Sequence, residues 1–167
     1  MSHAAVVLST VLLSAGLLSA CTGAQATDGR ARVVRVIDGD TIIVSIDHHH
    51  ETVRLLGINT PETKDPRKPV ECFGPEASER TKELLPPGTT VRLERDREPR
   101  DRYGRLLAWV HRLPDGLFVN DDLVAQGFAR VLVIPPNGIY AGSVEAAERS
   151  ARAASVGLWS ACAEASR

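Results

Sequence analysis

Aromatic residues and net charge are both scarce in this sequence. The chain of 167 residues contains three Phe, two Trp and two Tyr, and its formal net charge is −1. So few rings disfavour a surface that binds sugars through exposed aromatic platforms. A net charge near zero excludes attraction of a polyanion to the molecule as a whole. Binding of a polyanion therefore needs a local cluster. The arginine-rich stretch at 92–112 is the candidate, although such a run is usually a solvated face.

No stretch is long and apolar enough to predict a membrane-spanning helix. Residues 4–20 carry no charge, but the run is short and is interrupted by Ser and Thr. It is typical of the hydrophobic part of a signal peptide, although no Lys or Arg precedes it. Leu18-Ser19-Ala20-Cys21 predicts a lipid on Cys21, whereas cleavage after Ala26 would release a secreted protein. The favoured organisation is a lipoprotein signal peptide at 1–20, a flexible tether at 21–30 and one folded domain at 31–162.

Cysteine is also rare. Apart from Cys21, the chain contains only Cys72 and Cys162. Thiols outside the cytoplasm tend to be oxidised, so we predict that these two form a disulfide. The bridge would close a loop of roughly 90 residues, for which the chain-entropy model gives about 4–5 kcal/mol. Two unrelated buried thiols are the alternative, and a catalytic cysteine is disfavoured because neither residue has a histidine beside it in the sequence.

Alternating apolar residues predict a small domain rich in β-structure. Ile42, Val44 and Ile46 show the alternation most clearly. Five short strands are predicted, at about 31–37, 40–46, 52–58, 90–95 and 105–112. Three helices are predicted, at about 75–85, 120–127 and 143–155. A three-strand meander, a helix and a returning strand pair match the five-stranded Greek-key barrel of the OB-fold, an α+β fold that is mainly β.

Turn and capping residues indicate where these elements begin and end. Asp38-Gly39 is a two-residue hairpin signal, and residues 47–50 are the expected polar tip of the next turn. Asn120 and Ser143 are the expected N-caps of the second and third helices. His48-His49-His50 looks like a metal-binding tract, but consecutive residues at a hairpin tip cannot easily converge on one ion. We therefore interpret it as a solvated turn.

Three separated patches carry the functional signal. They are VIDGDT at 36–41, VRLLGINTPE at 53–62 and DRYGRLLA at 101–108. One patch alone would be weak, but all three in this order and spacing are specific. Together they resemble the signature of the staphylococcal nuclease, or thermonuclease, family, and the likeness runs from about residue 33 to residue 159. The resemblance implies an OB-fold enzyme that uses Ca²⁺ to hydrolyse DNA and RNA.

Hydrolysis of a phosphodiester needs a base for water, a cation, and donors for the charge of the transition state. Glu62 resembles the family glutamate that is assigned to activate the attacking water. Arg54 and Arg105 resemble the two catalytic arginines, and a planar guanidinium suits phosphate oxygens. Each residue alone could be an ordinary surface group. Within these motifs, all three are predicted to be catalytic.

Asp40, Asn59 and Thr60 are predicted to hold calcium. Asp40 follows a tight turn and Asn59 ends a strand, so both can present oxygen to a hard cation. The resemblance makes Asp40 the firm ligand and implies a backbone carbonyl ligand from Thr60. The best-known family member has a carboxylate where this chain has Asn59, so we expect weaker metal binding but not loss of the chemistry. Asp38 is either a plain turn residue or a group that orients a calcium-bound water.

Arg102 and Tyr103 match family positions that contact nucleotide phosphate, although Tyr103 could equally pack in the core. Family members can stack a base on tyrosines in the stretch that follows the second helix, whereas residues 131–136 contain none. Stacking contributes roughly 1–3 kcal/mol per base. Nucleotide affinity is therefore expected to be lower than the resemblance suggests, with Tyr140 as the candidate substitute.

The leading hypothesis is a calcium-dependent endonuclease of DNA and RNA that acts as a monomer and leaves 3′-phosphate ends. It would be exported, and either anchored to the membrane through Cys21 or secreted. The alternative is a catalytically idle OB-fold protein of the cell envelope that only binds nucleic acid, but such a module has no need of Glu62. An oligosaccharide-binding protein is disfavoured because Trp109 and Trp159 fall at expected core positions.

Overall fold

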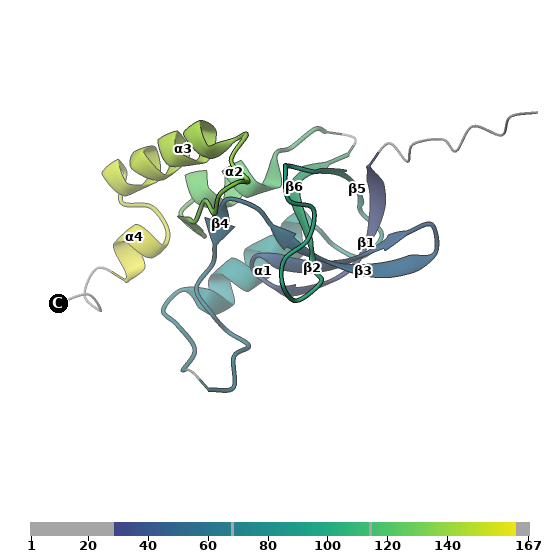
Figure 1. Ribbon diagram of the computed structural model, residues 1–167. Coiled ribbons are helices and arrows are strands. Elements are labelled where there is room, and N and C mark those ends of the chain that lie inside the picture. The colour runs from purple at the N-terminus through teal and green to yellow at the C-terminus, as the bar shows by residue number, and fades with distance from the viewer. Residues whose placement is uncertain (1–28, 68, 114, 163–167) are drawn as a thin grey trace, which may run out of the picture.

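The computed structural model describes residues 29–67, 69–113 and 115–162 (Figure 1). The predicted signal peptide, the lipidation site Cys21 and the alternative cleavage site at Ala26 lie outside the described residues. Among the helices of the described part, none is both long and apolar enough to cross a bilayer.

Five strands close into a barrel in the order β1-β2-β3-β6-β5. All neighbouring pairs are antiparallel except β3 and β6, which run parallel. Ile42, Val44 and Val53 are fully buried inside the barrel, as the alternating pattern predicts. The OB-fold prediction is confirmed. The strands are β1 (Arg30–Asp38), β2 (Thr41–Ile46), β3 (His49–Leu55), β5 (Thr90–Glu94) and β6 (Leu106–Arg112).

Helices pack beside the barrel and extend the molecule away from it (Figure 1). The first helix buries Ala77, Thr81 and Leu84 on one face. A fourth helix was not predicted, because its four residues are too few to show a helical period. The helices are α1 (Gly74–Leu84), α2 (Val119–Ala125), α3 (Ala141–Ala153) and α4 (Leu158–Ala161).

Both predicted N-caps are wrong. Asn120 lies inside α2, where its side chain accepts a hydrogen bond from Val110 N at 2.9 Å and donates one to the Leu56 carbonyl at 2.8 Å. Ser143 lies inside α3 and donates from its hydroxyl to Asp121 Oδ1 at 2.7 Å. Both side chains meet partners from distant segments, which the local sequence does not reveal.

The predicted strand at 52–58 is divided into two. The barrel strand β3 ends at Leu55, and β4 (Ile58–Asn59) pairs with β7 (Arg130–Val131) in a separate small sheet. Between them Gly57 has φ +72°, and a Cβ there would lie 2.4 Å from Trp109 Cη2. Only glycine fits a left-handed turn against that indole ring. The turn directs the chain from β3 back toward the end of the barrel.

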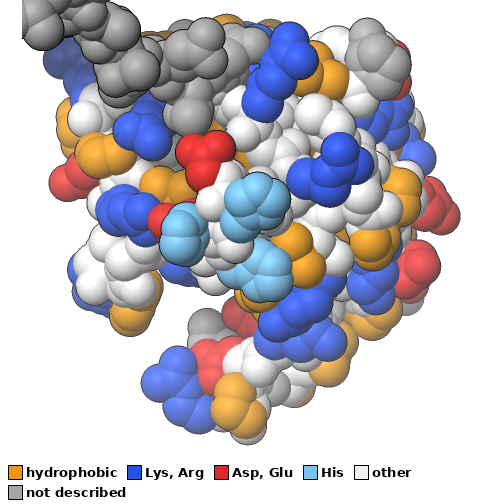
Figure 2. Space-filling view, turned by 90° about the vertical axis from the view of Figure 1, so that its right-hand side faces the viewer, with side chains coloured by type: hydrophobic (Ala, Val, Ile, Leu, Met, Phe, Trp, Pro, Cys, Tyr) orange, Lys and Arg blue, Asp and Glu red, His pale blue; other side chains and the backbone are white. Residues whose placement is uncertain are grey.

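The hairpin turns lie close to their predicted places. Gly39 and Asp40 form the tip between β1 and β2, because Asp38 and Thr41 are already paired. Asp47 and His48 form the next tip, with φ angles of 48° and 66°. His49 and His50 belong to β3, and histidines gather on the exposed surface at this end of the molecule (Figure 2). Only His48 of the three histidines therefore lies in the turn, and all three are exposed.

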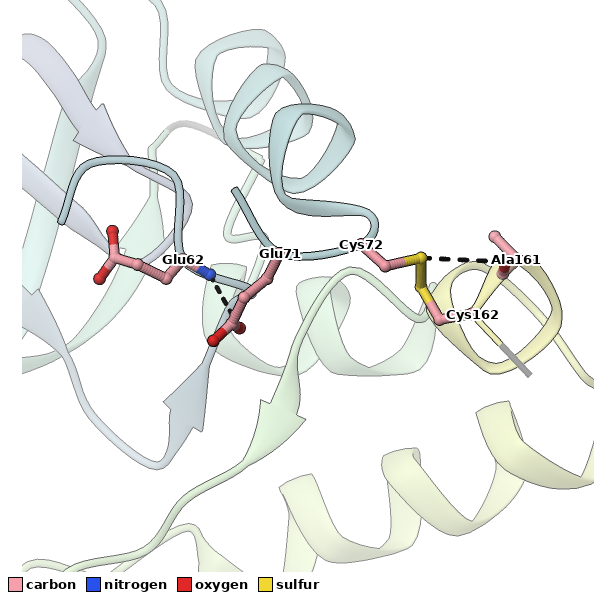
Figure 3. Close-up of a disulfide and its surroundings, with 5 residues drawn as sticks. All are labelled: Glu62, Glu71, Cys72, Ala161 and Cys162. Atoms are coloured by element: carbon pink, nitrogen blue, oxygen red, sulfur yellow. Dashed lines mark hydrogen bonds between the residues drawn. A yellow bond between two sulfur atoms is a disulfide. The ribbon is translucent and has the colours of Figure 1, made fainter. Parts of the chain in front are cut away.

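The structure contains the predicted disulfide. Cys72, just before α1, is bonded to Cys162, just after α4, with an S–S distance of 2.07 Å and a Cα–Cα distance of 6.0 Å (Figure 3). The bridge joins segments 90 residues apart in the sequence. Of the two tryptophans expected in the core, Trp109 is fully buried. Trp159 is only partly buried, which corrects that expectation, and Arg130 and Arg152 lie over its ring.

Candidate functional site

Backbone pairing brings Asp40, Arg54 and Arg105 to the same end of the barrel. Asp40 lies at the β1–β2 tip, and Arg54 is the penultimate residue of β3, opposite Thr41. Leu55 N donates to the Asp40 carbonyl at 2.9 Å, which ties the tip to β3. Arg105 immediately precedes β6, whose first residue is paired with Val53 of β3. The parallel pair therefore places two arginines from distant motifs side by side.

Arg54 lies at the centre of this group. Its Nη2 lies 3.0 Å from Asp40 Oδ2 and donates to Asn59 Oδ1 at 3.3 Å. Its Nη1 donates to the Leu55 carbonyl at 2.5 Å. The side chains of Arg54 and Asp40 are only 15% and 11% exposed. Burial lowers the pKa of Arg54, and the charge of Asp40 opposes this only in part. Because the ordinary pKa of arginine is so high, Arg54 remains charged.

The three predicted calcium ligands converge. Thr60 N donates to Asp40 Oδ2 at 3.1 Å, and Asn59 Oδ1 shares the Arg54 donor with Asp40. The side-chain oxygen of Thr60 is buried without a hydrogen-bond partner among the described protein groups. Carboxylate, amide and carbonyl oxygens are the ligands that Ca²⁺ prefers. The donor set thus fits a hard cation, with one carboxylate and otherwise neutral oxygens.

Glu62 faces the same cleft from a loop. Its Oε1 accepts hydrogen bonds from Lys64 N at 2.6 Å and Asp65 N at 3.0 Å. These bonds, the one from Lys64 above all, lower the pKa of Glu62, so its carboxylate is ionised at neutral pH. The cleft has a volume of about 510 Å³. Its lining includes Asp38, Asp40, Arg54, Asn59, Thr60, Glu62 and Arg105.

Asp38 connects the β1–β2 turn to the loop that carries Glu62. Its Oδ1 accepts from Gly39 N at 2.9 Å, as a turn residue does, and from the Thr63 hydroxyl at 2.7 Å. Burial raises the pKa of Asp38, and the hydrogen bonds from Thr63 and Gly39 oppose that rise only in part. Asp38 is therefore more than a plain turn residue, because it fixes the loop to the barrel.

Arg105 is held by the carboxylate of Asp101. Its Nε donates to Asp101 Oδ2 at 2.7 Å, and Asp101 Oδ1 accepts from the backbone N–H of both Tyr103 and Arg105. Burial raises the pKa of Asp101, but the bonds from Arg105 and Tyr103 outweigh it and leave the pKa below its ordinary value. Arg102 donates to the Tyr103 hydroxyl at 2.6 Å. The Tyr103 side chain is 69% exposed, which excludes core packing.

A second cleft, of about 560 Å³, adjoins the first and shares Arg54 and Arg105 with it. Tyr103, Leu132 and Ile134 also line it. Leu132 and Ile134 are 42% and 63% exposed, so exposed aliphatic side chains occupy the stretch in which the resemblance allows tyrosines. Tyr140 does not replace a stacking ring. It packs against Trp109 with centroids 5.4 Å apart and donates to Glu94 Oε1 at 3.0 Å, so that prediction is wrong.

Comparison with known proteins agrees with the fold and with the arrangement of the motifs. A family model described as "Staphylococcal nuclease homologue" matches residues 52–161. The chain belongs to the staphylococcal nuclease family. The predicted membership is thus confirmed. The matched range begins in β3 and ends with α4, so it includes Arg54, Glu62 and Arg105, whereas Asp40 precedes it.

Individual members of the staphylococcal nuclease family are similar over most of this chain. Thermonuclease of Staphylococcus intermedius is 47% identical over 127 residues, which cover 76% of this chain and 74% of that protein. Thermonuclease of Staphylococcus hyicus is 42% identical over 136 residues, covering 81% and 79%. Endonuclease YncB of Bacillus subtilis (strain 168) is 43% identical over 128 residues, covering 75% and 59%.

The sequence did not reveal two residues that contact this candidate site. Thr63 directly follows the second motif, and only its contact with Asp38 shows a role. Glu71 lies nine residues beyond Glu62, yet its Oε2 accepts from Glu62 N at 3.1 Å. Proline-rich sequence separates the two glutamates, and no periodicity in such a loop predicts that they meet.

Proposed function

We propose that this staphylococcal nuclease homologue is a calcium-dependent endonuclease that hydrolyses DNA and RNA and leaves 3′-phosphate ends. One observation carries the proposal: a single cleft gathers a buried carboxylate, two arginines and an ionised glutamate from three distant motifs. Proteins named thermonuclease and endonuclease are among its relatives, which supports nuclease activity. Calcium and the type of product end follow from the resemblance of the motifs.

Asp40, Asn59 and the Thr60 carbonyl would hold the calcium ion, which supplies positive charge beside the phosphate when bound. Asp40 pairs with Arg54 at 3.0 Å, so the calcium ion and the Arg54 guanidinium would share the Asp40 carboxylate. Because Asn59 is neutral, the ligand set has one negative charge fewer than a set with a carboxylate there. We therefore expect calcium to bind more weakly to this chain than to an Asn59→Asp variant.

Arg54 and Arg105 would bind the phosphate oxygens and stabilise the charge of the transition state. Each guanidinium is already oriented by a carboxylate, Asp40 for Arg54 and Asp101 for Arg105. Glu62 would take a proton from the attacking water as the water oxygen bonds to phosphorus. The bond to the 5′ oxygen would break and that oxygen would take a proton from solvent, giving a 5′-hydroxyl and leaving the phosphate on the 3′ oxygen. Arg102 and Tyr103 lie beside this centre and would contact a neighbouring nucleotide.

Digestion of single-stranded DNA by the mature protein tests the proposal, with calcium and with a calcium chelator. Glu62→Gln and Arg105→Ala are each expected to reduce calcium-dependent cleavage by about 10²–10³-fold. Glu145→Gln and Arg149→Ala alter exposed residues of α3 in the same ways and should leave the rate unchanged. Repair of the products with a 3′-phosphatase identifies the ends. If the folded protein cleaves neither DNA nor RNA at any calcium concentration, the proposed nuclease activity is wrong. The alternative of a barrel that only binds nucleic acid then remains.

We also propose that the protein is exported, either anchored through a lipid on Cys21 or secreted after cleavage at Ala26. The disulfide between Cys72 and Cys162 supports export, since such bonds persist in oxidising compartments. Labelling of cells with radioactive palmitate should mark the wild-type protein and not Cys21→Ser. Unlabelled protein in the medium that begins after Ala26 would instead establish secretion.

A further inference from the structure

The loop that carries Glu62 is closed by two hydrogen bonds between Glu62 and Glu71. Glu62 N donates to Glu71 Oε2 at 3.1 Å, and Glu71 N donates to the Glu62 carbonyl at 2.9 Å. In Figure 3 the Glu62 carboxylate points away from Glu71, while the Glu71 side chain reaches the Glu62 backbone. Glu71 therefore holds the backbone of Glu62 and leaves its carboxylate available to the cleft.

The residue after Glu71 is covalently fixed. Cys72 is bonded to Cys162 at the end of α4, and Cys72 Sγ lies 3.8 Å from the Ala161 carbonyl (Figure 3). That approach is a packing contact, because a disulfide sulfur has no hydrogen to donate. The short helix is itself anchored, since Leu158 is 1% exposed and its N–H donates to the Gly127 carbonyl at 2.9 Å. The bridge thus connects Glu71 to the helical part of the molecule.

The start of α1 packs against the same loop. A Cβ on Gly74 would lie 2.6 Å from Thr63 Cγ2 and 3.2 Å from the Pro61 carbonyl. Gly74 N also donates to the Glu71 carbonyl at 3.0 Å. Residues 71–74 are therefore held between residues 61–63 on one side and α4 on the other.

Most of this loop is irregular and exposed over its described residues. Residues 60–67 and 69–73 lie in no helix or strand, and most side chains from Lys64 to Cys72 within the described residues are exposed. A segment with exposed side chains and no strand or helix pairing opens at low free energy unless particular contacts restrain it. The contacts that restrain this loop include the bond from Thr63 to Asp38 and the two bonds between Glu62 and Glu71.

We propose that Glu71 is a positioning residue for Glu62, and that the Cys72–Cys162 disulfide keeps Glu71 in place, so that nuclease activity depends on the oxidation state of this bridge. The inference rests on the proposed function of Glu62. A dithiol such as dithiothreitol opens the bridge by transferring two electrons and two protons, which gives two cysteine thiols and one cyclic dithiothreitol disulfide. Glu71 then loses its anchor, and the Glu62 backbone loses its fixed position.

The first test compares Glu71→Ala with Glu71→Gln in the mature, oxidised protein. Alanine removes the acceptor of Glu62 N, and kcat is expected to fall roughly 10- to 100-fold with little change in KM. Glutamine keeps an acceptor oxygen and should restore most of the rate. Glu145→Ala makes the same change on the exposed face of α3 and serves as the control. Cleavage by Glu71→Ala at the wild-type rate overturns the role of Glu71.

The second test measures cleavage before and after reduction by dithiothreitol, with circular dichroism to confirm that the barrel remains folded. Reduction should slow the wild type about as much as Glu71→Ala does, and Cys72→Ser/Cys162→Ser should be slow without reductant. In Glu71→Ala, reduction should change the rate little further, because both changes act on one contact. Equal slowing of wild type and Glu71→Ala would show that the bridge acts on the fold and not through Glu71. An inactive oxidised wild type overturns the proposed function itself, so the two failures are distinct.

Discussion

The candidate site combines two regions that are held in different ways. The barrel rim, defined by Asp40, Arg54 and Arg105, consists of side chains on or beside paired strands. The Glu62 loop, residues 60–73, lies in no helix or strand over its described residues and is held by side-chain hydrogen bonds and one disulfide. In the proposed function, the groups that would meet the phosphate charge lie on or beside paired strands, and the group that would meet the water lies on the irregular loop.

Because of this difference, substitutions in the two regions should have different effects on stability and on activity. The rim side chains Arg54 and Asp40 are buried, so a change at the rim affects the fold together with the chemistry. The loop side chains are mostly exposed, so a change in the loop affects the chemistry with little effect on the barrel. Four substitutions or conditions test this separation.

The largest effect is expected at the rim, for Arg54→Lys. A lysine keeps the charge but cannot bond Asp40, Asn59 and the Leu55 carbonyl together, as the guanidinium does. Single-turnover cleavage should slow by about 10²–10³-fold. Arg149→Lys on α3 is the control for the chemical change. A rate within a fewfold of the wild type would mean that fixed guanidinium geometry at the rim is unimportant.

Gly57→Ala tests how far packing beneath the rim controls the fold. The new Cβ would lie 2.4 Å from Trp109 at φ +72°, so the free energy of unfolding should fall by about 3 kcal/mol. Gly116→Ala is a matched control, because its φ is +71° and no described atom lies within 4 Å of the added Cβ. That change should cost about 1 kcal/mol from the backbone alone. Urea denaturation gives both values, and equal losses would contradict a role for the Trp109 contact.

Thr63→Val breaks the link between loop and rim while keeping the shape of the side chain. The half-buried Asp38 carboxylate loses the donor at 2.7 Å, so stability should fall by about 1 kcal/mol. The pKa of Asp38, already raised by burial, should rise further, because Thr63 now lowers it. Titration of Asp38 by nuclear magnetic resonance measures this. An unchanged pKa would show that the hydrogen bond does not connect the two regions in solution.

The smallest effect is expected from mild acid. It should lower the stability of the barrel, through His111, and leave the charge of Glu62 in the loop unchanged. Burial, followed by the charge of Arg92, lowers the pKa of His111 below its ordinary 6.5, although Glu94 opposes the shift. The unfolded chain then binds more protons, so the contribution of His111 to stability is complete above pH 6.5 and is lost as the pH falls toward the folded pKa.

Urea denaturation between about pH 7.5 and 5.5 checks this sign, with His111→Gln as the comparison. The wild type should lose more stability across this range than the variant does. Glu62 keeps its charge throughout, because its pKa lies below 4.5. An equal pH dependence in both proteins would place the titrating group elsewhere.

Sequence by itself determined the barrel and the identity of the main site residues. Alternation at Ile42 and Val44 predicts a strand because each strand presents one face to the core. Resemblance of the three motifs to the family predicts Asp40, Arg54 and Arg105 as site residues, and strand pairing brings all three to one cleft. Oxidation outside the cytoplasm predicts the pairing of Cys72 and Cys162, which the structure contains.

Only the tertiary structure decided how these residues are supported. The turn at Gly57, the burial of Asn120 and the packing of Tyr140 on Trp109 each depend on a partner from a distant segment. The pairing of Glu62 with Glu71 depends on where an irregular loop closes, which no period in the sequence encodes. Local patterns reveal the face that a residue presents, whereas the partner it meets depends on how the chain closes in space.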